Sequence, residues 1–216
     1  MHSGLLGGLW LAWLAYWIAA ARGVKDARRQ ESTASRATHV VPLVLAGALL
    51  ASSRLPVPWL HYRLLPATAA AYWAGVAILI AGLGFTVWAR QHLAGNWSGT
   101  ITLKRDHELI RSGPYRLVRH PIYTGLLTAV LGTAVAMNDW RGVLAFAIMA
   151  AAMVRKIGLE ERWLGEAFPH EYRRYRAEVP ALFPFLPGSR SDRPTGPPRR
   201  RARGREPCGP EAARHR

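Results

Sequence analysis

Residues 67–88 read ATAAAYWAGVAILIAGLGFTVW, a run of 22 residues without a charged side chain. As a helix this run would rise about 33 Å, enough to cross the roughly 30 Å of hydrocarbon in a bilayer. Four more uncharged apolar runs occupy residues 4–21, 40–53, 122–137 and 142–154. Helices of soluble proteins carry charge along their outer face. The pattern therefore excludes an ordinary soluble globule and predicts an all-α fold, a polytopic membrane helix bundle of about five transmembrane helices.

The charged residues lie between these runs, and their distribution predicts the topology. The chain of 216 residues has 29 Lys and Arg against 13 Asp and Glu, a net charge of +16. Five crossings place residues 22–39, 89–121 and 155–216 on one side, and these segments hold 26 of the 29 basic residues. Basic residues favour the cytoplasmic side of a membrane. We therefore predict a protein of a bacterial-type inner (plasma) membrane, with the N-terminus outside and the C-terminus cytoplasmic.

The same pattern divides the chain into three parts. We predict two N-terminal transmembrane helices in residues 1–66, a core with three transmembrane helices in residues 67–186, and a disordered basic tail in residues 187–216. The tail is rich in Pro, Gly and Arg, a composition that cannot bury a core. Its arginines could contact anionic lipid or nucleic acid, but a solvated tail is the simpler interpretation. No nucleic-acid partner is predicted.

Cysteine and histidine give little indication of function. Cys208 is the single cysteine, so no intramolecular disulfide is possible. The eight histidines are scattered without the spacing of metal ligands. No metal site is predicted.

The last apolar run is too short to cross a bilayer alone. Thirteen residues rise only about 20 Å as a helix. Because nothing breaks the helical pattern before Pro169, we expect the helix to continue through residues 155–161. Lys156 and Glu160 then share one face, four residues apart. Ionisable residues at this depth indicate a functional site, although long side chains reaching for the interface are an alternative.

The loop before the fourth run has several features of a binding site. Gly113 and Pro114 predict a turn, and Pro121 suits the first turn of a helix because it lacks an N–H group. Arg119 and His120 stand beside that helix start, where the helix dipole favours a carboxylate or phosphate. The alternative is an ordinary basic loop that contacts lipid phosphates.

These two regions together resemble a known family. The ordered set consists of Gly113-x-Tyr115, then Arg119-His120-Pro121-x-Tyr123-x-Gly125, then Glu160-Glu161, then Phe168-x3-Tyr172-x2-Tyr175-x3-Val179-Pro180. Over roughly residues 67–187 it resembles the isoprenylcysteine carboxyl methyltransferases and related phospholipid methyltransferases. Arg-His-Pro alone would occur by chance, whereas the whole ordered set is specific.

The resemblance implies a membrane methyltransferase that uses S-adenosyl-L-methionine at the cytoplasmic ends of the last two spans. It assigns cofactor binding to ten residues: His107, Glu108, Leu109, Ile110, Tyr115, His120, Pro121, Ile122, Tyr123 and Glu160. Lys156 stands where the isoprenylcysteine enzymes place a substrate-binding Arg, so Lys156 and Glu160 are the predicted catalytic pair. Lys cannot grip a carboxylate with two hydrogen bonds, and this departure weakens the inference to a prenylcysteine carboxylate.

The resemblance also implies the partners, which are the lipid bilayer and a lipophilic or lipidated acceptor. Isoprenylcysteine carboxyl O-methylation is the first interpretation. Phospholipid amine N-methylation and small-thiol S-methylation are alternatives. A non-enzymatic membrane protein that recruits anionic lipids is more remote, as is a nicotinamide-dependent reductase. Gly82-x-Gly84 resembles a glycine motif of the phospholipid enzymes, but a role in helix packing is the simpler interpretation.

Overall fold

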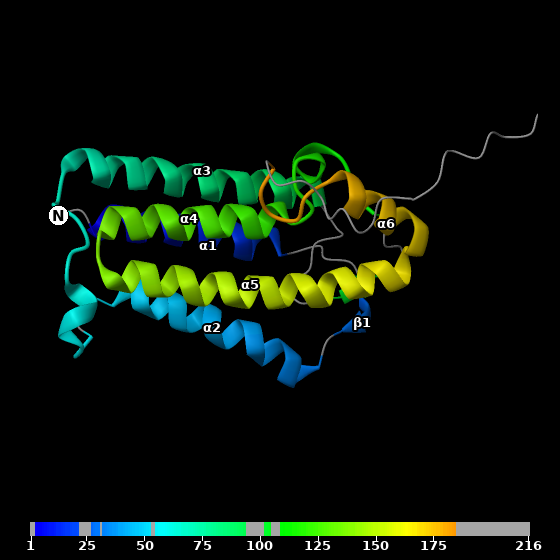
Figure 1. Ribbon diagram of the computed structural model, residues 1–216, viewed down its shortest axis with the longest axis horizontal. Helices are drawn as coiled ribbons and strands as arrows, with labels where there is room; N and C mark the ends of the chain where they lie inside the picture. The colour runs from blue at the N-terminus through cyan, green and yellow to red at the C-terminus, as the bar shows by residue number, and fades with distance from the viewer. Residues whose placement is uncertain are drawn as a thin grey trace, which may run out of the picture.

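The computed structural model describes residues 3–21, 27–30, 32–52, 55–93, 102–104 and 109–184. Its main elements are long helices that lie side by side (Figure 1). The elements are α1 (Ser3–Ala20), β1 (Ala27–Gln30), α2 (Thr33–Ala51), η1 (Pro58–His61), α3 (Ala69–Leu93), β2 (Thr102–Lys104), η3 (Gly113–Arg116), α4 (Pro121–Met137), α5 (Trp140–Ala167) and α6 (Pro169–Glu178). The predicted all-α bundle is confirmed. β1 and β2, which form a small antiparallel pair, were not predicted.

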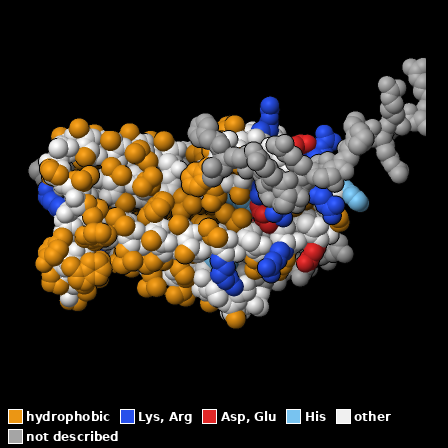
Figure 2. Space-filling model, viewed as in Figure 1, with side chains coloured by type: hydrophobic (Ala, Val, Ile, Leu, Met, Phe, Trp, Pro, Cys, Tyr) orange, Lys and Arg blue, Asp and Glu red, His pale blue; other side chains and the backbone are white. Residues whose placement is uncertain are grey.

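The helices have the length and composition of a membrane bundle. Among the described residues, α2, α3 and α5 are long and apolar enough to cross a bilayer, and α1 and α4 contribute shorter apolar helices. On the face shown in Figure 2, apolar side chains cover most of the helical region, and most charged side chains gather toward α6. The protein is therefore an integral membrane protein. The number of spans and the orientation of the termini stay predictions.

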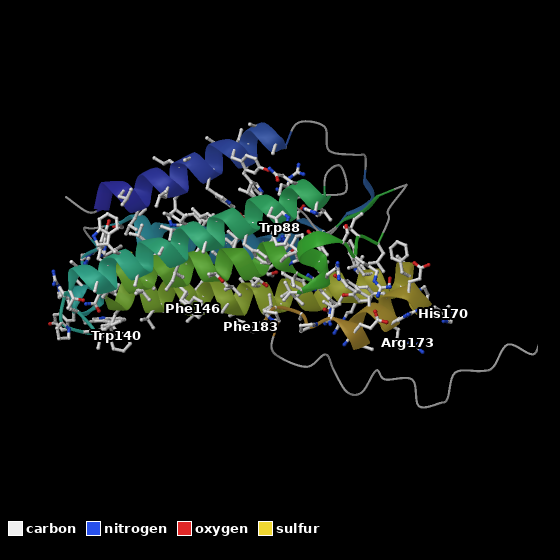
Figure 3. All side chains as sticks on the ribbon, turned by 90° about the horizontal axis from the view of Figure 1, so that it is seen from above. Trp88, Trp140, Phe146, His170, Arg173 and Phe183 are labelled. Carbon is white, nitrogen blue, oxygen red and sulfur yellow. The ribbon has the colours of Figure 1, made fainter. Side chains whose placement is uncertain are left out.

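We call the end of the bundle that carries η3, α6, the start of α4 and the end of α5 the charged end. Figure 3 shows Trp140 at the opposite end and His170 and Arg173 at the charged end. The expected continuation of the last apolar run is confirmed, because α5 extends to Ala167 in a single helix. α5 begins where Asp139 caps it by accepting from the Gly142 N–H. The long α5 carries its ionisable residues beyond its apolar part to the charged end.

Glycine determines how closely α3 and α4 approach. A Cβ atom added at Gly82 would lie 2.5 Å from the backbone nitrogen of Ala129, and one at Gly75 would lie 2.5 Å from that of Ala136. On α4, Gly125 and Gly132 face the α3 backbone in the same way. Small residues allow such backbone contact between membrane helices. Gly82 therefore serves helix packing, as the simpler interpretation of its motif predicted. The same prediction is wrong for Gly84, where an added Cβ would meet no protein atom within 4 Å.

Tryptophan attaches α1 to this pair. The Trp10 indole donates to the Thr133 hydroxyl at 3.1 Å, and the Trp13 indole donates to the Thr86 hydroxyl at 2.7 Å. Leu6 packs in a core cluster with residues of α3 and α4. Because large indole rings fill this interface, α1 contacts α3 through side chains, whereas α3 and α4 meet through their backbones.

Candidate cofactor and acceptor site

The charged end brings together three segments that lie far apart in the sequence. They are the start of α4, the last turns of α5, and the chain that follows α6. The segment after α6 returns to α4, where the Arg119 N–H donates to the Pro180 carbonyl at 2.8 Å and the His120 N–H to the Ala181 carbonyl at 3.0 Å. Backbone hydrogen bonds alone thus hold the segment after α6 against the start of α4.

Arg119 and Glu161 form the buried centre of this end. The Arg119 Nε and Nη2 atoms donate to Glu161 Oε1 at 2.9 and 2.7 Å. The Arg119 Nη1 atom also donates to the carbonyls of Arg176 and Val179. The two side chains are only 7% and 12% exposed. Arg119 is therefore occupied in joining α4, α5 and α6, and it does not provide the free anion-binding group that the sequence indicated.

His120 lies between two carboxylates. Its Nε2 atom is 3.1 Å from Glu161 Oε1, and its Nδ1 atom is 3.8 Å from Glu160 Oε2. The imidazole is buried, and its ring stacks on that of Tyr123, with centroids 5.6 Å apart and planes 8° from parallel. The ring is held by contacts on its face and at its edge, which fixes the direction in which it points.

Glu160 is the carboxylate of this group that reaches solvent. Its side chain is 33% exposed, and Oε2 accepts a 2.7 Å hydrogen bond from the Tyr123 hydroxyl. Glu160 and Glu161 are adjacent on α5, so their side chains leave the helix about 100° apart. One carboxylate therefore enters the buried centre with Arg119, and the other remains available to a ligand.

Lys156 lies one turn before Glu160 on α5 and is 8% exposed. Its Nζ atom stands 5.4 Å from the centre of the Tyr123 ring. A cation near an aromatic face is attracted by the ring electrons. Tyr123 thus contacts the Lys156 ammonium through its face and the Glu160 carboxylate through its hydroxyl, and it connects the two residues of the predicted catalytic pair.

The aromatic residues of α6 close the site from the other side. Tyr172 and Tyr175 are buried with Val179, and Leu109 packs against this cluster. The Tyr175 hydroxyl donates to the Tyr115 carbonyl at 2.6 Å. Burial raises the pKa of Tyr175 above its ordinary value, so the hydroxyl stays protonated and remains a donor. α6 therefore anchors η3, which carries Tyr115, against the charged end.

Tyr115 is the residue of η3 that approaches the carboxylates. It is 8% exposed. Its pKa is raised, first by burial and then by the negative charge of Glu160.

The predicted site residues fall into three groups. His120, Pro121, Ile122, Tyr123, Lys156 and Glu160 meet at the charged end, with Tyr115 beside them. Leu109 and Ile110 are partly buried at the start of the last described stretch, and Leu109 faces the α6 cluster. His107 and Glu108 lie outside the described residues. Whether these residues bind a cofactor stays a prediction.

Sequence reasoning included Glu161 in the family motif but did not identify its pairing with Arg119 or the contacts of the chain after α6. The signal for Glu161 was its place next to Glu160, since neighbours on a helix face different ways. The carbonyls of residues 179–182 carry no side-chain signal, so their contacts with α4 are visible only in the structure. Within the described part of the chain, no group of three His, Cys, Asp or Glu residues is placed to hold a metal ion.

Comparison with known families matches the same region. A model of the phospholipid methyltransferase family matches residues 70–171, which run from the start of α3 to α6. The match covers just under half of the chain, so the chain is similar to this family over its core helices. The matched region includes α4, α5 and the paired carboxylates Glu160 and Glu161.

Curated relatives share this region. The cobalt-zinc-cadmium resistance protein CzcN of Cupriavidus metallidurans is 34% identical over 152 residues, which are 68% of this chain and 61% of that protein. Protein-S-isoprenylcysteine O-methyltransferase B of Arabidopsis thaliana is 33% identical over 113 residues, 51% of each chain. The protein-S-isoprenylcysteine O-methyltransferase of Schizosaccharomyces pombe is 33% identical over 95 residues, 43% of this chain and 40% of that one. The chain thus spans between two fifths and three fifths of the length of these relatives.

Proposed function

We propose that this protein is a member of the phospholipid methyltransferase family, an integral membrane methyltransferase that uses S-adenosyl-L-methionine. The observation that carries the proposal is the Glu160 carboxylate, which is partly exposed and is oriented by the Tyr123 hydroxyl at 2.7 Å. A carboxylate beside an aromatic ring favours a positively charged ligand. The protein-S-isoprenylcysteine O-methyltransferases among the relatives support the same activity.

The residues at the charged end fit this cofactor by their chemistry. When bound, S-adenosyl-L-methionine would supply a methyl group activated by a positively charged sulfur. Glu160 would hold positive charge, and the stacked rings of His120 and Tyr123 would provide an aromatic wall. We assign the remaining contacts to the predicted set: His107, Glu108, Leu109, Ile110, Tyr115, Pro121 and Ile122.

For the acceptor, we propose a lipophilic carboxylate such as that of an S-prenylated cysteine. Lys156 would hold the carboxylate by its charge. Lys156 lies one turn before Glu160 on α5, so the acceptor would be held close to the cofactor. A carboxylate needs no general base, so Lys156 and Glu160 would act mainly by alignment and by excluding water. The charged end would face the cytoplasm of a bacterial-type inner membrane, and the acceptor would enter sideways from the bilayer.

An amine or thiol acceptor would have to lose a proton first. Glu161 is a poor acceptor for that proton because it already binds Arg119 and His120. Among the described residues, Glu160 and His120 remain as candidates. Methylation of a phospholipid amine or a small thiol is therefore the second candidate function. The observation that favours it is Lys156, which stands where the resemblance places an arginine in the isoprenylcysteine enzymes.

Calorimetric titration of the detergent-purified protein with S-adenosylhomocysteine tests cofactor binding. We expect binding by the wild type and a loss of at least tenfold in affinity for Glu160→Ala and His120→Ala. Glu178→Ala is the matched control, since Glu178 pairs with Arg111 and Arg174 on the surface of α6. Wild-type affinity in Glu160→Ala would refute the assignment of Glu160.

The acceptor is tested by transfer of a radiolabelled methyl group. The assay offers an S-farnesylated cysteine derivative, phosphatidylethanolamine and a small thiol in parallel. A methyl ester releases its label as methanol in base, whereas N-methyl and S-methyl products keep it. Base-labile product with the farnesylated acceptor, reduced in Lys156→Ala and retained in Lys156→Arg, is the expected result. Base-stable product alone would favour the second candidate.

A further inference from the structure

A large cavity among the described residues lies away from the candidate cofactor site. Its volume is about 1020 Å³, and residues of all five long helices line it. α1 bounds it on one side through Gly7, Trp10 and Leu14, and α2 on the other through Gly47 and Leu50. Sites for drug-sized ligands span about 300–1,000 Å³. The cavity is therefore large enough for a ligand with long apolar chains.

The length of the cavity matches one leaflet of a bilayer. Along α4 its lining extends from Leu126 to Met137, twelve residues or about 18 Å of helix. Half of the hydrocarbon core of a bilayer is about 15 Å thick. Leu11 and Trp73, which belong to the lining, are 68% and 56% exposed. Because these apolar side chains face the surroundings of the bundle, acyl chains can enter sideways from the bilayer.

The polar end of the cavity lies opposite the charged end. Arg63, Thr68, Asn138 and Arg141 line it there, while the rest of the lining is almost entirely apolar. Arg141 is held by Asp139 and by the Ser52 carbonyl, and Asn138 is bound to the backbone of Leu65. Arg63 is exposed, and within the described residues it has no carboxylate within ion-pair distance. A guanidinium at the end of an apolar cavity is suited to a phosphate.

From this arrangement we propose that the cavity binds one glycerophospholipid of the leaflet opposite the candidate cofactor site. The phosphate of the lipid binds Arg63, and its acyl chains fill the space between α1 and α2. A methyl acceptor would have to present its reacting group at Tyr123 and Glu160, which are beyond the other end of the cavity. The lipid is therefore a bound structural ligand that fills the space between α1 and α2. This role is independent of the methyltransferase activity.

Glycine substitutions test the proposal with a matched control. Gly7 and Gly47 line the cavity, and a Cβ atom at either would meet no protein atom within 4 Å. Gly8 has the same open surroundings but is not part of the lining. Gly7→Phe and Gly47→Phe therefore place a ring in the cavity, whereas Gly8→Phe places the same ring on the neighbouring position of α1.

The full-length variants are purified in mild detergent, washed, and analysed by native mass spectrometry and phosphorus assay after addition of phosphatidylglycerol or phosphatidylcholine. Circular dichroism checks that each variant is folded, and having two cavity variants keeps the test decisive if one fails to fold. We expect one phospholipid per wild-type chain, a several-fold loss in Gly7→Phe and Gly47→Phe, and wild-type binding in Gly8→Phe. Arg63→Gln should bind phosphatidylglycerol about tenfold less tightly.

Three results would overturn the proposal. The first is a wild-type protein that retains no phospholipid above the level of the detergent micelle. The second is a folded Gly7→Phe or Gly47→Phe protein that retains as much lipid as Gly8→Phe. The third is a bound lipophilic molecule without phosphate, which would indicate that the cavity holds the chain of an acceptor.

Discussion

Removing Glu161 is the perturbation that most directly tests how the charged end is held together. Glu161→Ala leaves the Arg119 guanidinium buried without its carboxylate. Loss of one partner of a buried ion pair costs about 3–5 kcal/mol. Arg119 keeps the carbonyls of Arg176 and Val179 as acceptors, so we expect a cost near 3 kcal/mol, at the lower end of this range.

The matched control is Glu178→Ala. Glu178 also pairs with two arginines, Arg111 and Arg174, but its side chain is 46% exposed, against 12% for Glu161. Exposed ion pairs contribute only about 0–1 kcal/mol. The two substitutions remove the same chemical group from the same protein, so the difference between them measures the effect of burial.

The assay is equilibrium unfolding in mixed micelles with an increasing fraction of denaturing detergent, followed by tryptophan fluorescence. Glu161→Gln keeps an acceptor oxygen and should fall between the wild type and Glu161→Ala. The double variant Arg119→Leu with Glu161→Leu should cost less than the sum of the single variants, by about 0.5–3 kcal/mol. If Glu161→Ala costs no more than Glu178→Ala, the buried pair does not hold α4, α5 and α6 together.

Three further predictions concern packing and titration. Gly82→Ala should lower the thermal midpoint, at a cost of about 1–3 kcal/mol, because its Cβ would collide with Ala129. Gly84→Ala is the control, because position 84 faces open space and the substitution should be neutral or stabilising. Equal midpoints for the two variants would contradict the close contact of α3 and α4. Thr86→Val should cost about 1 kcal/mol in the same unfolding assay by leaving the Trp13 indole without its acceptor, and an unchanged free energy of unfolding would show that this bond does not anchor α1. Burial raises the pKa values of Tyr115, Tyr172 and Tyr175 in the folded state, so these phenols stay neutral at a pH near 10, where those of the unfolded chain ionise. The free energy of unfolding should therefore be unaffected below that pH and fall above it. A free energy of unfolding that stays constant as the pH rises from 9 to 11 would argue against the burial of these phenols.

The sequence by itself determined that the chain forms a bundle of apolar helices, because long stretches without charge have few alternatives to a membrane helix. It located the ends of some helices closely, but α2 begins at Thr33, seven residues before its apolar run, and α3 ends at Leu93, five residues after its run. The fourth apolar run, residues 122–137, corresponds to α4, and the helix after the fifth run continues past Lys156 and Glu160 as expected. These features depend on local composition and periodicity, which a sequence displays directly.

Only the tertiary structure decided how the candidate site is divided between its two carboxylates. Glu160 and Glu161 are chemically equivalent in the sequence, and their roles depend on which of them meets Arg119. That contact requires α4, α5 and α6 to meet, and the backbone carbonyls of residues 176–182 that complete it have no side-chain signature. The cavity between α1 and α2 likewise depends on packing, because residues of five helices line it and none of these helices defines it alone.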